Sequence, residues 1–446
     1  MRYSLGGDFL YKAVVIGGGW SGCAAALSAK KAGADVTLIE KTDLLLGLGN
    51  VGGIMRNNGR FTAAEENIAM GASELFGITD KCSRHVNIDF PGHKHASLYD
   101  VTKVEPEVRR LLREMGIEVK LMARAVDVVT KKKEQWLKSD EDEVSIERII
   151  LAGGESIEGD VFIETTGSTG PMGNCLTYGN GCCMCILRCP AFGPRVSISA
   201  KAGSTDIMGR RKDGAFGAFS GSGKLEKQSL SEELQQQLNE SGVAVVPLPK
   251  KAVKKEKLDM KVCRQYALDE YAENIILLDT GYAKIMTPFF DLDTLRQIPG
   301  FENARYVDPY AGGKGNSVRY LSVAERNNAM KVVKISNLFC GGEKSGLFVG
   351  HTEAISTGSL AGHNAARYLK GMKPLELPVG IAVGDIISFA NARLDTEEGL
   401  MTRYTFAGAE YFSRMKEKRL YSIKREEIES RVRRYGLDNI YKEKLF

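Results

Sequence analysis

The chain has 446 residues, of which 43% are hydrophobic and 26% are charged, and its formal net charge is +5. This is the composition of a soluble globular protein, and the length predicts two or three units around a sizeable core. No apolar run approaches the roughly 20 residues of a membrane span, and the mild charge does not demand nucleic acid. Residues 1–12 lack the apolar region of a signal peptide, so we expect a cytoplasmic protein.

The motif that organises the chain lies near its N-terminus. An apolar run at 13–16 predicts a buried strand, an Ala-rich segment at 23–32 predicts a helix, and a second apolar run at 36–39 predicts another strand. Three glycines in the spacing GxGxxG stand between the first strand and the helix: Gly17, Gly19 and Gly22. Glycines alone indicate an ordinary turn, but this order of elements predicts a dinucleotide-binding unit.

Each residue of the motif has a mechanical role. Gly17 permits the tight turn from strand to helix, Gly19 lets the backbone approach a pyrophosphate, and Gly22 lets helix and strand pack closely. The helix N-terminus offers N–H groups and a partial positive charge to the phosphates. Glu40 ends the second strand, where its carboxylate accepts from ribose hydroxyls. We assign the next residue, Lys41, to the same site.

The segment 44–60 is rich in glycine and asparagine, which predicts a loop. In flavin-binding folds such a loop runs along the cofactor, and we therefore expect Asn50, Gly52 and Gly53 to bind the cofactor. The alternative is a flexible surface loop. The apolar residues within the segment indicate that it is not fully exposed.

The next segments predict a helix at 62–76 and another at 105–115. Three of the five histidines lie between them, within 82–99. The pair His93-x-His95 leaves a metal open, but no carboxylate or cysteine pattern accompanies it. We therefore expect polar histidines in a loop.

Strands at 117–122 and 125–129 and a charged hairpin or loop at 131–142 predict an antiparallel addition that completes a cofactor-binding domain. The segment 160–167 predicts another buried strand, which ends in a Thr-Thr-Gly turn. In large flavoproteins such a strand lies near the adenosine, and this assigns Gly167 to the cofactor site. The alternative is one more core strand.

The most unusual segment is 174–197, which holds five cysteines within fifteen positions: Cys175, Cys182, Cys183, Cys185 and Cys189. Three interpretations stay open. In the first, four of these five candidate ligands hold an iron–sulfur cluster or zinc, although the spacing matches neither common ferredoxin pattern. Cys185 and Cys189, four residues apart on one helical face, could form a redox dithiol or supply a nucleophile. The third interpretation is buried packing, which such density disfavours.

The remaining segments carry less information. Residues 201–224 predict an extended loop, and 229–240 predict a polar helix. The basic run at 250–257 indicates a solvated linker, with an RNA phosphate contact as the alternative. The tail from 374 predicts helices of mixed charge. Its basic stretch at 415–436 indicates a solvated helix, with a partner- or RNA-facing helix as the alternative.

Two late stretches carry a resemblance. Residues 296–321 place the phrase Ile-Pro-Gly-Phe-Glu-Asn-Ala before a predicted strand, and residues 335–371 combine an apolar strand, a glycine-rich turn and a small-residue helix ending in Asn-Ala-Ala. They resemble the GidA-type tRNA-modifying flavoproteins and the folate- and FAD-dependent tRNA uracil methyltransferases, TrmFO. Residues 49–54, Gly-Asn-Val-Gly-Gly-Ile, resemble the flavin-side loop of these families.

The resemblance implies FAD, rather than NAD, as the tightly held cofactor. It places Gly342 and Glu343 beside the ribityl and phosphate groups, and the N-terminus of the closing helix, at Thr352, Glu353 and Ala354, opposite the pyrimidine end of the flavin. A strand, a glycine turn and a helix N-terminus put backbone N–H groups where a developing flavin anion needs them.

The chain also departs from these families. They place a cysteine in or just before the flavin-side loop, whereas this chain has none between Cys23 and Cys82. Cys189-Pro190 resembles the second cysteine of the methyltransferases, which a proline also follows. The missing loop cysteine counts against the methyl-transfer mechanism.

We therefore predict an α/β fold with one discontinuous, GR2-like Rossmann-type FAD-binding domain, built from 11–170 and closed by 331–372. The expected inserted substrate and Cys-rich domain is 171–330, and the expected helical C-terminal region is 373–446. Only one dinucleotide fingerprint is present, so the sequence does not support a separate NAD domain.

The first functional hypothesis is an FAD-dependent oxidoreductase that passes a hydride or electrons to or from a small molecule or a redox partner protein. Cys185 and Cys189 are its candidate redox or nucleophilic residues, and His351 is its candidate proton donor. NAD(P)H stays open as the electron donor. The alternatives are a folate- and FAD-dependent tRNA-uridine-modifying enzyme and an electron carrier with flavin and an iron–sulfur cluster.

Overall fold

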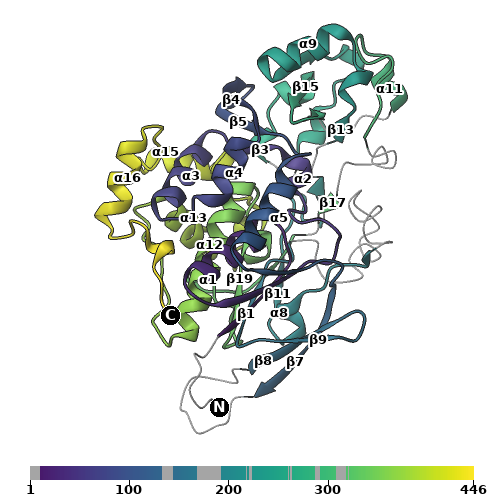
Figure 1. Cartoon of the computed structure of the whole chain (residues 1–446). Helices are drawn as coiled ribbons and strands as arrows, with labels where there is room; N and C mark the ends of the chain where they lie inside the picture. Colours follow the sequence, from purple (N-terminus) through teal and green to yellow (C-terminus); the bar gives the residue numbers. More distant parts are fainter. Residues whose placement is uncertain are drawn as a thin grey trace.

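The computed structural model describes residues 11–132, 144–167, 192–216, 218–219, 223–259, 261, 264–286, 292–307, 318–319 and 321–446. Its centre is a five-stranded parallel sheet of order β19-β10-β1-β2-β6 (Figure 1). The strands are β1 (Lys12–Ile16), β2 (Asp35–Ile39), β6 (Glu118–Lys120), β10 (Val161–Glu164) and β19 (Leu338–Cys340). Strands from 11–170 and from 331–372 therefore form one sheet, in which β10 pairs with both β1 and β19.

The sheet is covered on both faces, as its strands of nearly continuous apolar residues require. Side chains alternate along a strand, so Ala13 and Val15 join one core cluster while Val14 and Ile16 join another. Three helices pack in the first cluster: α1 (Trp20–Lys31), α5 (Val104–Glu114) and α12 (His351–Leu369). An antiparallel sheet packs in the second: β7 (Ala125–Lys132), β8 (Val144–Leu151) and β9 (Ser156–Glu158). This confirms the predicted fold class.

Helices α1 and α12 are in backbone contact. A Cβ atom on Gly358 would lie 2.2 Å from the carbonyl oxygen of Ser21, and one on Gly362 would lie 2.1 Å from that of Ala25. No larger residue fits at either position without moving a helix. Both helices follow strands of the same parallel sheet, so both N-termini lie at its carboxyl edge, where open α/β sheets bind ligands.

A second layer of antiparallel sheets lies beyond that edge. The sheet of order β3-β5-β4 contains β3 (Ile54–Arg56), β4 (Ser83–Phe90) and β5 (His93–Tyr99). The sheet of order β13-β16-β15-β14 contains β13 (Gly223–Leu225), β14 (Val243–Pro247), β15 (Asn274–Asp279) and β16 (Ala283–Ile285). Ile54 and Leu98 share a core cluster with Ile276 and Tyr271. Segment 54–99 therefore packs against the insertion.

The histidine-bearing segment is not a loop, as the sequence suggested, but the β4–β5 hairpin. The helix expected over 62–76 is two helices, α3 (Gly59–Ala69) and α4 (Glu74–Lys81). Gly71 lies between them with φ +96°, a conformation that glycine adopts without strain. The sequence prediction joined the two helices because apolar residues continue across this break.

The insertion has more regular structure than expected. Residues 201–224 contain β11 (Asp206–Met208), which pairs with β18 (Ser322–Ala324), and the start of β13. Helix α9 (Glu232–Ser241) agrees with the predicted polar helix, and the side chain of its N-cap, Ser231, accepts from the N–H of Leu234. The shorter elements are α8 (Ile198–Lys201), α10 (Glu270–Glu273), α11 (Leu292–Arg296), β12 (Ala218–Phe219) and β17 (Val318–Arg319).

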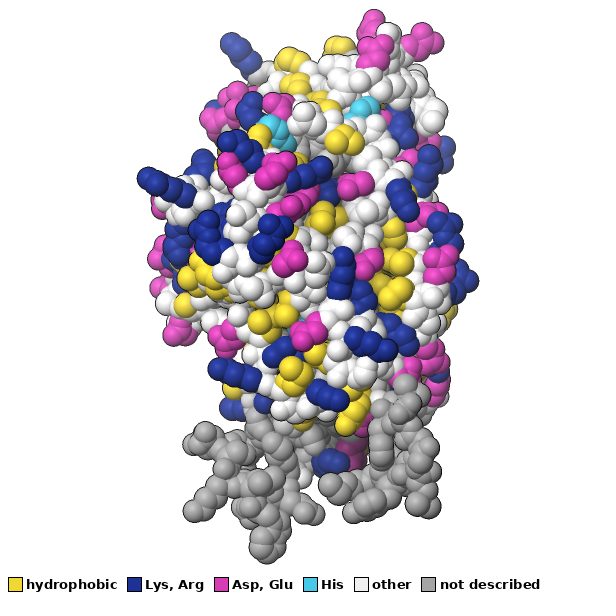
Figure 2. All heavy atoms as spheres, turned by 60° about the vertical axis from the view of Figure 1, so that its left-hand side comes forward, with side chains coloured by type: hydrophobic (Ala, Val, Ile, Leu, Met, Phe, Trp, Pro, Cys, Tyr) yellow, Lys and Arg dark blue, Asp and Glu magenta, His cyan; other side chains and the backbone are white. Residues whose placement is uncertain are grey.

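The C-terminal region is helical, as predicted, with α13 (Ala382–Asn391), α14 (Glu397–Met401), α15 (Ala409–Glu417) and α16 (Arg425–Arg434). The helix expected over 415–436 is interrupted between α15 and α16. Helix α16 is largely exposed, as expected, and buries only Ile428 and Val432. Arg425 on α16 pairs with Glu65 on α3 at 3.2 Å. Figure 2 shows basic and acidic side chains interspersed on one face of the molecule. No helix among the described residues is long and apolar enough to cross a membrane.

Candidate cofactor site

The turn between β1 and α1 has the geometry that its glycines predict. Gly17 has φ +105°, and its N–H donates to the carbonyl of Ile39 at 2.8 Å. A Cβ atom on Gly22 would lie 1.8 Å from the carbonyl oxygen of Gly17, whereas a Cβ atom on Gly19 would meet nothing within 4 Å. Gly19 is also the N-cap of α1 and provides no side-chain cap. The turn therefore leaves an open approach to the first N–H groups of the helix.

The end of β2 presents a fixed carboxylate to the same turn. The N–H of Gly18 donates to Glu40 Oε2 at 2.8 Å, and the N–H and hydroxyl of Thr42 donate to Oε1 at 2.9 and 3.0 Å. The side chain of the next residue, Lys41, donates from Nζ to the carbonyl of Gly193 at 2.7 Å. Glu40 is thus oriented by backbone and hydroxyl donors at the carboxyl edge of the sheet.

The loop after β2 lies against the glycine turn. The N–H of Leu46 donates to the carbonyl of Gly18 at 2.7 Å, and Asn50 Nδ2 donates to the carbonyl of Leu45 at 2.7 Å. The Asn50 side chain therefore stabilises the conformation of the loop. Asn50 is also the second residue of the short helix α2 (Gly49–Gly52). The two other predicted loop residues, Gly52 and Gly53, lie against α12 and the insertion.

Gly52 and Gly53 are places of close approach. A Cβ atom on Gly52 would lie 1.9 Å from His351 Cε1, and one on Gly53 would lie 2.2 Å from Thr280 Cγ2. Lys284, a buried residue of β16, donates through Nζ to the carbonyl of Gly52. The loop is therefore held between the N-terminus of α12 and the insertion. Sequence reasoning missed Lys284, which carries no motif.

The closing segment repeats this arrangement at the other end of the site. Gly341 donates from its N–H to the carbonyl of Glu164 at 3.0 Å, and Gly342, with φ +67°, donates to Thr357 Oγ1 at 2.8 Å. Gly350 is the N-cap of α12 and again provides no side-chain cap. Two helix N-termini without side-chain caps thus lie at one edge of the sheet.

The other predicted residues are distributed around this edge. Gly167 follows β10 with φ +81°, and a Cβ atom there would lie 3.1 Å from Arg195 Nη1. Glu343 is partly buried in the turn after β19. Thr352 donates its hydroxyl to the carbonyl of Met55 at 2.6 Å. Ala354 lies in the first turn of α12.

His351 begins α12 and contacts Tyr99 and Trp20. The Tyr99 hydroxyl lies 2.6 Å from the carbonyl of Gly49 and 3.1 Å from His351 Nδ1. Burial raises the pKa of Tyr99, so the hydroxyl keeps its proton. A carbonyl only accepts, so the hydroxyl donates to Gly49 and accepts from His351 Nδ1–H. The proton of the neutral ring is therefore fixed on Nδ1.

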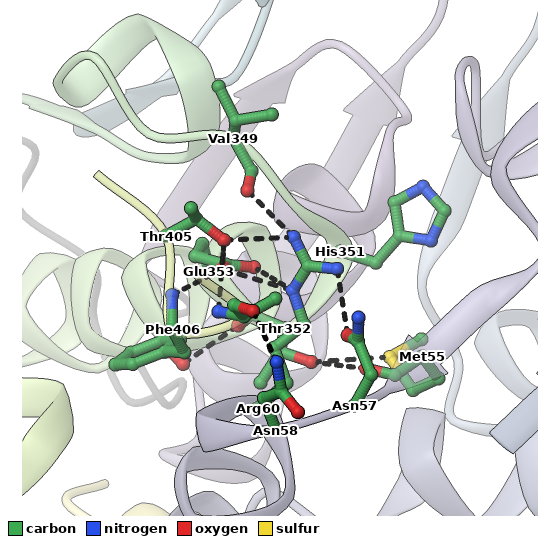
Figure 3. Close-up of polar contacts among 12 residues, drawn as sticks. Met55, Asn57, Asn58, Arg60, Val349, His351, Thr352, Glu353, Thr405 and Phe406 are labelled. Carbon is green, nitrogen blue, oxygen red and sulfur yellow. Dashed lines mark hydrogen bonds and ion pairs between the residues drawn. The ribbon is translucent and has the colours of Figure 1, made fainter. Parts of the chain in front are cut away.

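Glu353 does not face outward from the helix end as a cofactor ligand would. Its side chain is fully buried and pairs with Arg60 Nε at 3.0 Å (Figure 3). Burial acts to lower the pKa of Arg60, but Glu353 outweighs it and holds that pKa above its usual value. Any contact of Glu353 with a cofactor is left to its backbone. Arg60 was missed because its partner lies 293 residues away in the sequence.

His93 and His95 belong to no candidate metal site among the residues that the structure describes. His93 Nε2 lies 3.0 Å from the carbonyl of Gln265, and Asn57 Nδ2 lies 2.9 Å from His93 Nδ1, so both ring nitrogens are engaged. Burial lowers the pKa of His93 to about 3, which keeps the ring neutral. Within the described ranges no group of three or more His, Cys, Asp or Glu residues could hold a metal ion.

The cysteines of the described residues are buried: Cys23, Cys82 and Cys340. Burial raises the pKa of each thiol, to about 12 for Cys340, so none of these three is a thiolate nucleophile at neutral pH. The predicted metal, redox and nucleophilic residues lie outside the described residues: Cys175, Cys182, Cys183, Cys185 and Cys189.

The geometry fits FAD. An open glycine turn, an oriented acid on the next strand and two uncapped helix N-termini at one sheet edge match the needs of a pyrophosphate, a ribose and an electron-accepting ring. The fold and site thus define a dinucleotide-binding flavoprotein.

The family model of glucose inhibited division protein A matches residues 12–276 and 269–373. The chain therefore belongs to the GidA family of FAD-dependent proteins, as the sequence resemblance implied. Segments of curated relatives are also similar. A TrmFO methylenetetrahydrofolate–tRNA-(uracil-5-)-methyltransferase of Caldicellulosiruptor bescii is 35% identical over 21% of this chain and 21% of its own length. A tRNA uridine 5-carboxymethylaminomethyl modification enzyme MnmG of Campylobacter fetus is 31% identical over 24% and 18%.

The solved structures support the fold over nearly the whole chain. Aquifex aeolicus GidA, in its form II crystal, superposes with a TM-score of 0.64 over 97% of this chain and 74% of that protein, at 16% identity. The form I crystal gives a TM-score of 0.61 over 98% and 78%. The sequence matches to the curated relatives, by contrast, span only about a fifth of their length.

Proposed function

We propose that the protein is an FAD-dependent enzyme that modifies the C5 position of a uridine in tRNA. The observation that carries the proposal is the match of the GidA family model to residues 12–276 and 269–373. The names of the TrmFO and MnmG relatives both describe chemistry at C5 of a tRNA uridine. This was an alternative at the level of sequence, where an oxidoreductase for a small molecule or partner protein ranked first.

Each part of the site would contact a different part of FAD. Gly17, Gly19 and Gly22 with the N-terminus of α1 would hold the pyrophosphate, and Glu40 would bind the ribose. Bound FAD would supply hydride and electron transfer. The N–H groups at the start of α12 would stabilise negative charge on the ring.

His351 would hold and move a proton. Its Nδ1–H is fixed by Tyr99 at 3.1 Å, so in the neutral ring Nε2 is the nitrogen that takes up and returns a proton. Lys284 donates to the carbonyl of Gly52, and the imidazole lies where a Cβ atom on Gly52 would be. These contacts support a positioned acid–base group at the end of α12.

The Cys-rich segment keeps its three interpretations. Cys185 and Cys189 are proposed as redox or nucleophilic residues, and an iron–sulfur cluster held by four thiolates of this segment is the competing proposal. Iron and acid-labile sulfide per flavin, measured on protein purified without oxygen, separate the two. NAD(P)H as electron donor and a cytoplasmic location belong to the same proposal.

The proposed function is tested in cells from which the gene has been deleted. Total tRNA is digested to nucleosides and compared by mass spectrometry with tRNA from complemented cells. We expect one C5-modified uridine to disappear and to return with the intact gene, but not with Gly22→Ala. Loss of 5-methyluridine would indicate the methyltransferase reaction, and loss of a 5-carboxymethylaminomethyl-type uridine the other. An unchanged set of C5-modified uridines would refute the proposal.

A further inference from the structure

A buried ion pair joins α3 to the first turn of α12. The side chains of Arg60 and Glu353 are 3% and 0% exposed, and Arg60 Nε lies 3.0 Å from both carboxylate oxygens. Arg60 Nη2 donates to the carbonyl of Val349 at 2.8 Å, and Nη1 donates to Asn57 Oδ1 at 3.1 Å. Arg60 therefore connects α3 to the residues that lead into α12 (Figure 3).

The carboxylate is held equally firmly. Glu353 Oε1 accepts from the Thr405 hydroxyl at 2.8 Å and from the N–H of Phe406 at 2.9 Å. A Cβ atom on Gly350, the N-cap of α12, would lie 1.9 Å from Glu353 Oε2 and 2.2 Å from Arg60 Nη2. The carboxylate and the guanidinium therefore both lie against the backbone of Gly350, where the helix starts. Only glycine fits there while the pair is formed.

The position of the pair gives it an electrostatic role. The N-terminus of α12 lies at the same sheet edge as that of α1, where FAD binds in this fold. Salt screens buried charges weakly. An unpaired carboxylate in the first turn would oppose negative charge on a reduced flavin, and an unpaired guanidinium would favour it. Together the two charges cancel, and the helix dipole remains.

We propose that Arg60 and Glu353 are positioning residues that set the reduction potential of the bound flavin by fixing and neutralising the first turn of α12. The inference rests on the FAD binding assumed in the proposed function. A chain of hydrogen bonds also connects the ion pair to the insertion: Arg60 donates to Asn57, Asn57 donates to His93, and His93 donates to the carbonyl of Gln265.

The test measures the flavin midpoint potential of the holoenzyme at pH 8, by equilibration with a reference dye, together with FAD content and melting temperature. The variants are Glu353→Gln, Arg60→Gln, the double variant and Arg60→Lys. Arg414→Gln is the matched control, because Arg414 pairs with the buried Asp385 at 2.8 Å in the C-terminal region.

We expect Glu353→Gln to favour flavin reduction and Arg60→Gln to disfavour it, each by about tenfold in the two-electron equilibrium, or about 30 mV. The double variant and Arg60→Lys should return to within twofold of the wild type, and Arg414→Gln should not differ from it. A scaffold role alone predicts lower stability without shifts of opposite sign.

Single-variant shifts of the same sign, or shifts no larger than that of Arg414→Gln, would overturn the inference. If Arg60→Gln fails to fold, the other two variants still decide: Glu353→Gln must favour flavin reduction about tenfold while Arg60→Lys stays within twofold of the wild type, and any other result overturns the inference. Wild-type protein that binds no FAD would instead refute the cofactor on which the proposed function depends.

Discussion

The clearest consequence of the glycine turn concerns Gly22→Ala. The added Cβ would lie 1.8 Å from the carbonyl oxygen of Gly17 and 2.8 Å from Thr165 Oγ1, whereas real Cβ contacts essentially never fall below 3.0 Å. Helix α1 must therefore move by about 1 Å relative to β1. Overpacking of this kind costs about 1–3 kcal/mol. Because the displaced N–H groups are those that face the pyrophosphate, we expect the cost to appear in FAD affinity.

At about 1.4 kcal/mol per tenfold change, the upper end of that range corresponds to FAD binding about 100-fold weaker. Titration of the apoprotein with FAD, followed by flavin fluorescence, measures it. Gly77→Ala is the matched control, since Gly77 lies inside α4 and an added Cβ would meet nothing within 4 Å. That variant should bind FAD normally and gain up to about 1 kcal/mol of stability. Gly22→Ala protein that binds FAD within threefold of the Gly77→Ala protein would refute the reasoning.

Two further predictions follow from charged groups. Glu40→Gln removes a charged acceptor of the Gly18 N–H and should weaken FAD binding about tenfold without unfolding the protein, as fluorescence titration would show; unchanged affinity would remove Glu40 from the site. Burial raises the pKa of Asp385, but hydrogen bonds from Arg414 and Lys418 outweigh it and hold that pKa below its usual value. Asp385→Asn should therefore lose about 2 kcal/mol of stability at neutral pH. This loss should shrink below about pH 4, as the wild-type carboxylate takes up its proton; a loss that stays constant in acid would contradict the assignment.

Local rules predicted the core of the fold because its signals are local. The strand, the GxGxxG spacing and the acid at Glu40 all lie within residues 13–40, and the closing strand, turn and helix lie within 335–371. Each segment therefore specified one half of a parallel unit. That the two segments build one domain followed from the resemblance rather than from any local pattern, and the structure joins them through β10, which pairs with both β1 and β19.

The sequence failed where long-range contacts decide. The break at Gly71 depends on a backbone conformation that a run of helix-forming residues conceals. His93 looks polar in the sequence but is buried, because Asn57 and the carbonyl of Gln265 satisfy its ring. Arg60 could not be recognised as a site residue from the sequence, because its role depends on the ion pair with Glu353, which is distant in the sequence. Residues 201–224 were predicted as a loop because their strands are short and pair antiparallel over long sequence separations.

The central claim is that one FAD lies between the N-termini of α1 and α12. A crystal structure of the protein grown with FAD tests it most directly. The account predicts the pyrophosphate against the N–H groups that follow Gly19, the adenosine ribose at Glu40, and the flavin ring at the start of α12. A flavin bound away from either helix N-terminus would contradict the account.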